Sequence, residues 1–124
     1  MHYRIDPDAR VAVITWPAGI PVFADWVAAV EVLLSDSAWQ SGFGVVSDWR
    51  QATSEPDLEF VRAFVAFLAT KNARGLGRWV TVVDPASPAV FGMGRMGEAL
   101  TDNIGIEFRV VTDFAEALRW ARGD

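Results

Sequence analysis

Short apolar runs alternate with longer segments of helically spaced apolar positions along this chain of 124 residues. The apolar or alternating runs are typical of strands and have turn residues at their ends. They cover residues 10–16, 43–48, 78–84 and 106–111. Apolar residues that recur every three or four positions, as on one face of a helix, cover residues 21–35, 56–71, 88–101 and 114–121. A more polar run, residues 2–6, precedes the turn Asp6-Pro7-Asp8 and predicts the first strand of a hairpin.

The order of these segments predicts an α/β domain. It is β-β-α-β-α-β-α-β-α, with no internal repeat and no linker. Alternating strands and helices with short connections favour right-handed crossovers and parallel strands, whereas the initial hairpin is antiparallel. We therefore predict a single domain over residues 1–124, with a mixed sheet of five strands and with four helices.

The stretch from Phe43 to Lys71 organises the predicted site. Its strand ends at Asp48, and we expect Ser54 to cap the long helix that follows, because the serine hydroxyl can accept a hydrogen bond from the amide of Asp57. Ligands and partners usually dock at the carboxyl ends of strands in open α/β sheets. We therefore expect Asp48 and Ser54 to share one outward-facing corner of the molecule.

Two further aspartates, Asp84 and Asp113, end strands or begin the elements after them, and with Asp48 they form a candidate rim of the site. Three carboxylates at one rim can hold a divalent cation through oxygen ligands. The alternative, which we favour, is that each aspartate caps a loop or a helix start. The spacing of Asp113 and Glu116 is that of a capping box. We therefore predict no metal site and no cofactor.

The chain carries eight Phe and six Trp residues, and some of these rings are expected at a partner surface because Trp is rarely fully buried. Phe60 and Phe67 lie on the flank of the apolar face of their helix, and Phe91 lies opposite the apolar stripe of the next helix. These three residues are the candidate interface of a homodimer or of a complex with another protein. An equally favoured alternative is that the two flanking residues wedge under a neighbouring helix. The excess of Trp, Phe and Met also suits a pocket for a small apolar molecule.

Residues 92–97 match the pattern G-x-G-x-x-G of dinucleotide-binding loops. In that motif the first glycine lies in the turn directly after a strand. Here seven residues separate Asp84 from Gly92, and the glycines fall within a helical segment. We therefore do not predict nucleotide binding, and we attribute Gly97 to a close approach of helix and sheet.

Composition argues against several other functions. The net charge of -5 argues against binding to nucleic acid or to an anionic membrane, since phosphate contacts require clustered cations. The chain has no Cys, and its one histidine, His2, starts an edge strand, so no pair of nucleophile and base is visible and we predict no enzymatic activity. There is no apolar targeting segment and no run of about 18 apolar residues, so we expect a cytoplasmic protein.

Two segments, VVSDWRQATSEPDLEFV (45–61) and VVTDFAEALRW (110–120), resemble the SpoIIAA-like branch of the STAS superfamily. This is the fold of anti-sigma-factor antagonists, which is also likened to lipid-exchanging CRAL-TRIO domains, and the resemblance covers nearly the whole chain through the order of its elements. In the antagonists a kinase phosphorylates a serine at the start of the helix after the third strand, so the resemblance implies Ser54, with Thr53 beside it, as the phosphosite. The chain has Thr53-Ser54-Glu55-Pro56 there, without the preceding Asp and the following Gly of the Asp-Ser-Ser/Thr-Gly motif of the family.

These observations lead to two functional hypotheses. The first is a non-enzymatic protein-interaction or regulatory module that resembles anti-sigma-factor antagonists but lacks their intact phosphorylation motif. The alternative is a binding protein for a small, lipid-like apolar molecule. The sequence names neither the partner nor the ligand.

Overall fold

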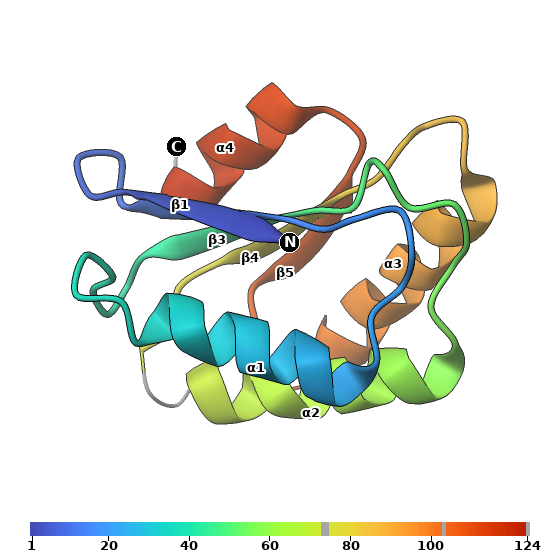
Figure 1. Cartoon of the computed structure of the whole chain (residues 1–124), viewed down its shortest axis with the longest axis horizontal. Coiled ribbons are helices and arrows are strands. Elements are labelled where there is room, and N and C mark those ends of the chain that lie inside the picture. The colour runs from blue at the N-terminus through green and yellow to red at the C-terminus, as the bar shows by residue number, and fades with distance from the viewer. Residues whose placement is uncertain (73–74, 103, 124) are drawn as a thin grey trace.

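The computed structural model describes residues 1–72, 75–102 and 104–123, and these form an α/β fold (Figure 1). In this part of the chain one sheet has the strand order β1 (His2–Asp6), β2 (Val11–Thr15), β3 (Gly44–Asp48), β4 (Trp79–Val82) and β5 (Phe108–Val111). The helices are α1 (Phe23–Leu34), α2 (Leu58–Asn72), α3 (Pro88–Asp102) and α4 (Phe114–Arg122). β1 runs antiparallel to β2, and the other neighbouring strands are parallel. The predicted mixed sheet of five strands with four helices is therefore confirmed for the described residues.

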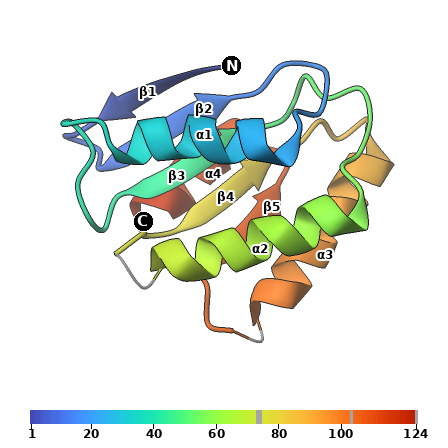
Figure 2. The same cartoon turned by 60° about the horizontal axis from the view of Figure 1, so that its bottom comes forward.

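Helices α1, α2 and α3 cover one face of the sheet, and α4 covers the other (Figures 1 and 2). Each of the first three helices joins two neighbouring parallel strands, and each crossover moves one strand along the sheet in the same direction. Right-handed crossovers that all progress in one direction lie on the same face. Helix α4 follows the last strand, so it has no further strand to reach and packs back across β4, β3 and β2 on the free face.

The two-residue repeat of the strands divides the core into two layers. The layer that faces α1, α2 and α3 holds the larger side chains, among them Ile14, Trp16, Trp79 and Phe108. The layer that faces α4 consists mostly of valines, together with Ala117 and Ala121 of the helix. The backbones approach closely at Gly44, where a Cβ atom would overlap the carbonyl group of Ala121. Small residues therefore allow α4 to lie directly on the sheet.

The start of α2 differs from the prediction. The Asp57 carboxylate accepts a hydrogen bond from the amide of Phe60 at 2.8 Å, so Asp57 caps this helix and Ser54 does not. Ser54 lies in the loop before the helix because the next residue, Glu55, precedes a proline and is sterically disfavoured from the helical region. An acceptor closer to the first helical turn therefore decides where the helix starts.

Trp26 of α1 lies at the centre of an aromatic cluster in the larger core layer and is fully buried. Its ring centroid is 6.2 Å from that of Phe60 and 5.2 Å from that of Phe67. Both phenylalanines are half-buried by these contacts, so the structure shows the alternative in which they wedge under a neighbouring helix. Phe91 is also half-buried against this layer, and not on the side away from the core, because α3 packs against both β5 and α2. An interface made by these phenylalanines stays a prediction.

The glycine-rich segment lies inside α3, as predicted, and not in a turn after a strand. The close approach of helix and sheet occurs at Gly94, where a Cβ atom would come within 2.5 Å of Val110 Cγ2. At Gly97, where we expected it, a Cβ atom would make an ordinary contact 3.5 Å from the ring of Phe108. Of these two glycines, Gly94 is therefore the one with no room for a side chain.

Candidate functional site

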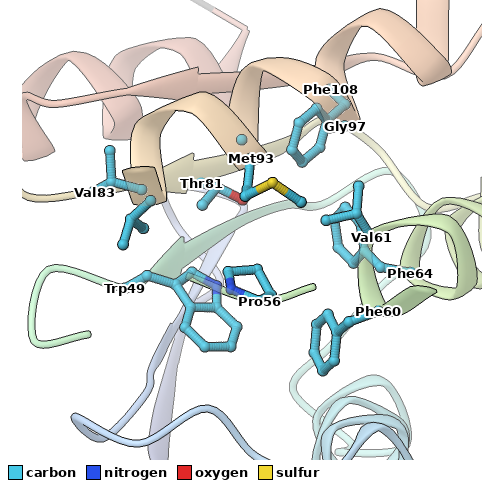
Figure 3. Close-up of a pocket in the computed structure, with 12 residues that line it drawn as sticks. Trp49, Pro56, Phe60, Val61, Phe64, Thr81, Val83, Met93, Gly97 and Phe108 are labelled. Atoms are coloured by element: carbon cyan, nitrogen blue, oxygen red, sulfur yellow. The ribbon is translucent and has the colours of Figure 1, made fainter. Parts of the chain in front are cut away.

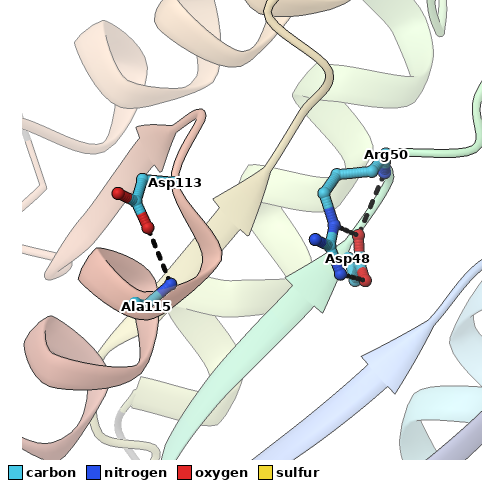
Figure 4. A network of polar contacts seen from close by, with 4 residues as sticks. All are labelled: Asp48, Arg50, Asp113 and Ala115. Carbon is cyan, nitrogen blue, oxygen red and sulfur yellow. Dashed lines mark hydrogen bonds and ion pairs between the residues drawn. The ribbon is translucent and has the colours of Figure 1, made fainter.

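Asp48, at the carboxyl end of β3, is buried and bound to Arg50 two residues later. Nε and Nη2 of Arg50 donate to the two carboxylate oxygens at 2.9 and 2.8 Å, and the backbone amide of Arg50 donates to one of them at 3.0 Å (Figure 4). The guanidinium carbon also lies 4.6 Å from the ring centroid of Phe114, at the start of α4. The hydrogen bond to Asp48 is the main cause that raises the pKa of Arg50. Asp48 therefore forms a local ion pair with Arg50 on the α4 face of the sheet.

Ser54 lies in a loop on the other face, next to α1 and α2. Side chains alternate along a strand, so Asp48 faces α4 together with Val46. The amide and the hydroxyl of Thr53 both donate to the carbonyl of Ala18, at 3.1 and 3.3 Å, and hold the loop beside the segment that leads into α1. Asp48 and Ser54 therefore do not share one exposed corner, contrary to the prediction from the sequence.

The two candidate phosphosites differ in their hydrogen bonds. Thr53 uses its hydroxyl for the bond to the neighbouring loop, whereas the exposed hydroxyl of Ser54 bonds to no residue in the described part of the chain. Of the two hydroxyls, that of Ser54 is therefore the one that modification would not take from a hydrogen bond within the described chain. The nearby charged residues in the same groove, Glu55, Asp57 and Glu59, are all acidic. Phosphorylation at either hydroxyl stays a prediction.

The other two aspartates of the predicted rim each bind the backbone of their own turn. Asp84 accepts a hydrogen bond from the amide of Ala86 at 2.9 Å. Asp113 caps α4, as predicted, by accepting hydrogen bonds from the amides of Ala115 at 2.8 Å (Figure 4) and of Glu116 at 3.2 Å. Within residues 1–72, 75–102 and 104–123, no group of three or more His, Cys, Asp or Glu residues is placed to hold a metal ion. The hydrogen bonds therefore support the capping alternative for these aspartates.

An open groove of about 510 Å³ lies between the first turns of α1 and α2. Its apolar walls include Ile20, Val22, Phe23 and Phe60, and Ser54 also lines it. Among the described residues, every charged side chain in the lining is acidic. Val22 is 70% exposed and occupies the N-cap position of α1, where its side chain makes no capping hydrogen bond.

A smaller cavity of about 60 Å³ adjoins this groove and lies between α2, α3 and the sheet (Figure 3). Pro56 and Phe60 belong to the walls of both. The rest of the lining is apolar except for Thr81 and the indole of Trp49, whose N–H already donates to Ser47. Thr81 therefore brings a hydroxyl to a surface that is otherwise almost entirely apolar.

A buried hydrogen-bond network, which the sequence analysis missed, supports this end of the sheet. The Ser47 hydroxyl accepts hydrogen bonds from Nε1 of Trp16 at 3.0 Å and from Nε1 of Trp49 at 2.9 Å. The two indole rings stack with their centroids 5.2 Å apart. Ser47 inside an apolar strand, with Trp49 two residues later, was a signal that the sequence offered. Trp16 could not be linked to them from the sequence, because it follows the neighbouring strand β2.

Comparison with known proteins leaves the family open. No family model matches the chain, and neither does any curated protein or any solved structure. The resemblance to the SpoIIAA-like branch of the STAS superfamily therefore stays a prediction. In the described residues, no helix has both the length and the apolar character that crossing a membrane requires. His2 is exposed at the start of the edge strand β1.

Proposed function

We propose that this chain is a non-enzymatic interaction module whose groove between α1 and α2 holds a basic, apolar segment of a partner protein. The observation that carries the proposal is Val22, which lies 70% exposed in the wall of that groove. Val22 occupies the N-cap of α1, where Ser, Thr, Asp or Asn would accept an amide hydrogen bond and stabilise the helix by about 0.5–2 kcal/mol. An exposed apolar residue that adjoins further apolar surface, at a position where it is unfavourable for the fold, is typical of a surface used for binding.

The groove offers further apolar surface around this residue. Ile20 and Phe23 flank Val22 along the chain, and Phe60 contributes from the first turn of α2. Complete burial of one aliphatic side chain of this size is worth about 1.5–3 kcal/mol. Burial of Val22 by a partner therefore supplies a substantial share of the binding free energy of roughly 8 kcal/mol that a dissociation constant of about 1 μM requires.

The charges around the groove select the kind of partner. Glu55 and Glu59 form no ion pair with any described residue, and no basic side chain from that part of the chain lines the groove. The whole chain carries a net charge of -5. Opposite charge accelerates encounter and suppresses wrong partners, so the favoured occupant carries Arg or Lys among its apolar residues. A phosphate on Ser54 would add about two negative charges and strengthen this preference.

The test compares two exposed valines near opposite ends of α1. Val22→Asn removes the apolar contact and introduces a good N-cap, whereas Val32→Asn changes a valine that is 58% exposed and lies outside the groove. We expect a fluorescent peptide of alternating Arg and Leu to bind the native chain and the Val32→Asn variant. It should bind the Val22→Asn variant about tenfold more weakly, since that variant loses roughly 1.5 kcal/mol of burial. Urea unfolding should show that the weaker binder is the more stable protein.

Two further measurements decide between occupants. A peptide of alternating Glu and Leu should not bind, and Glu59→Gln should weaken binding of the Arg and Leu peptide more at low salt than at high salt. Equal binding by the two valine variants would contradict the proposal. If sedimentation shows a dimer that Val22→Asn dissociates, the groove belongs to a second copy of the chain and not to a separate basic partner.

A further inference from the structure

We infer that the cavity between α2, α3 and β4 binds a small, mainly apolar molecule that carries a single hydroxyl or carbonyl group, with Thr81 as its hydrogen-bonding partner. This site is separate from the groove proposed for a protein partner, although Pro56 and Phe60 form a wall of each. The cavity lies beside the carboxyl-terminal half of β4 and α3, and apolar side chains such as Val61, Phe64 and Met93 surround it (Figure 3). Val90 of α3 also lines it.

Thr81 is the residue that points to a ligand. Its side chain projects from β4 into the cavity (Figure 3), and the residue is 9% exposed. In the part of the chain that the structure describes, its hydroxyl forms no hydrogen bond, whereas Ser47, its partner in the register of β3 and β4, accepts two. The hydroxyl oxygen is not among the described side-chain atoms that are wholly buried without a partner, so it stays accessible from the cavity. A hydroxyl on an otherwise apolar wall is suited to orient a bound molecule through one hydrogen bond.

Water that reaches this hydroxyl finds few other polar partners in the cavity. A buried water molecule is held by two to four polar partners, and the described lining offers the hydroxyl of Thr81 beside a Trp49 N–H that is already bound. Apolar surface of this kind favours contact with apolar molecules over contact with water. The preferred occupant is thus largely hydrocarbon, with one polar group directed at Thr81.

The size of the cavity limits the ligand. A volume of about 60 Å³ corresponds to roughly four or five water-sized spheres, which a molecule of about five non-hydrogen atoms fills. This is far below the 300 Å³ or so of an ordinary ligand pocket, so a lipid does not fit the cavity as it stands. Met93 lies across the cavity in Figure 3, and its unbranched side chain can turn aside to admit a somewhat larger molecule.

The experiment uses the methionine methyl groups as reporters. Met93 lines the cavity, and Met96 lies on the same helix but is 40% exposed and outside the cavity, so it serves as the internal control. The chain with labelled methionine methyl groups is titrated with 1-butanol, which has one hydroxyl, and separately with xenon, which has none. We expect a saturable shift of the Met93 signal with either probe, and no such shift of the Met96 signal.

Two variants complete the test. Thr81→Val keeps the shape of the side chain and should weaken binding of 1-butanol about three- to tenfold, the effect of one lost hydrogen bond, while xenon binding stays unchanged. Val90→Ile adds one methylene to the lining and should reduce binding of both probes. The absence of any saturable Met93 shift would overturn the inference. So would a Thr81→Val variant that binds 1-butanol as well as the native chain does, or a Val90→Ile variant that binds both probes unchanged.

Discussion

Replacing Ser47 with alanine removes the acceptor that two buried indole N–H groups share, those of Trp16 and Trp49. The substitution deletes one oxygen atom and creates almost no cavity, so its effect comes from hydrogen bonding and not from packing. Trp16 is 2% exposed and Trp49 is 8% exposed, so water cannot take the place of the serine at Trp16 and reaches Trp49 only in part. Ser47→Ala therefore tests whether this network holds the carboxyl end of β3 in place.

The expected cost follows from the two unsatisfied donors. Each buried polar group without a partner costs about 1–3 kcal/mol. With partial access of water to one of them, we expect Ser47→Ala to lower the free energy of unfolding by about 2–4 kcal/mol. A domain of this size has about 5–15 kcal/mol of stability, so the melting temperature should fall by on the order of 10 °C.

The assay is urea unfolding followed by tryptophan fluorescence, with Thr81→Val as the matched control. Thr81 lies opposite Ser47 on the neighbouring strand and faces the same core layer, but its hydroxyl forms no hydrogen bond within the described chain. Its removal should change the free energy of unfolding by less than about 1 kcal/mol, with an unchanged slope in urea. If Ser47→Ala is as mild as this control, the shared acceptor does not stabilise the fold and the reasoning is refuted.

Two other predictions concern the helix α3 and the first strand. Gly94→Ala should destabilise the fold by about 1–3 kcal/mol, because the new Cβ atom meets Val110. In the same helix, the Cβ atom of Gly92→Ala enters open space, so this substitution should stabilise the fold by about 0.5–1 kcal/mol. Equal shifts of the melting temperature for the two variants would contradict this account. The hydroxyl of Tyr3 donates to Asp36 at 2.9 Å, and this hydrogen bond is the main cause that raises the pKa of Tyr3. A raised pKa means that the stabilisation is complete below the ordinary value of 10.0 and is lost as the pH rises through the value in the folded protein. Because the chain has a single tyrosine, phenolate absorbance reports the ionisation of Tyr3 directly. In the Asp36→Asn variant, the midpoint of the pH titration should move down toward the ordinary pKa of tyrosine. A midpoint that does not move would rule the contact out.

The sequence alone determined the elements and their order. Strand and helix periods differ, so the runs before Asp48 and the stripe of residues 88–101 were assigned correctly without knowledge of their neighbours. The cap at Asp113 was also predictable, because the carboxylate and the amides that it binds are separated by only two and three residues. The parallel pairing of the later strands was also predictable, because alternating strands and helices with short connections favour right-handed crossovers.

Only the tertiary structure decided which side chains meet. Asp48 and Ser54 are close in sequence, but the pleat of β3 turns the aspartate toward α4 while the loop carries the serine toward α1. The sequence left Phe60 and Phe67 equally open to an interface and to a position under a neighbouring helix, because a helical wheel does not show that Trp26 of another helix contacts them. The hydroxyl of Thr81 lines a cavity whose walls come from two helices and the sheet, so its role cannot be inferred from its own strand. Contacts between elements depend on the register of the strands and on the distance between the layers. Neither of these can be inferred from the spacing of apolar residues within one segment.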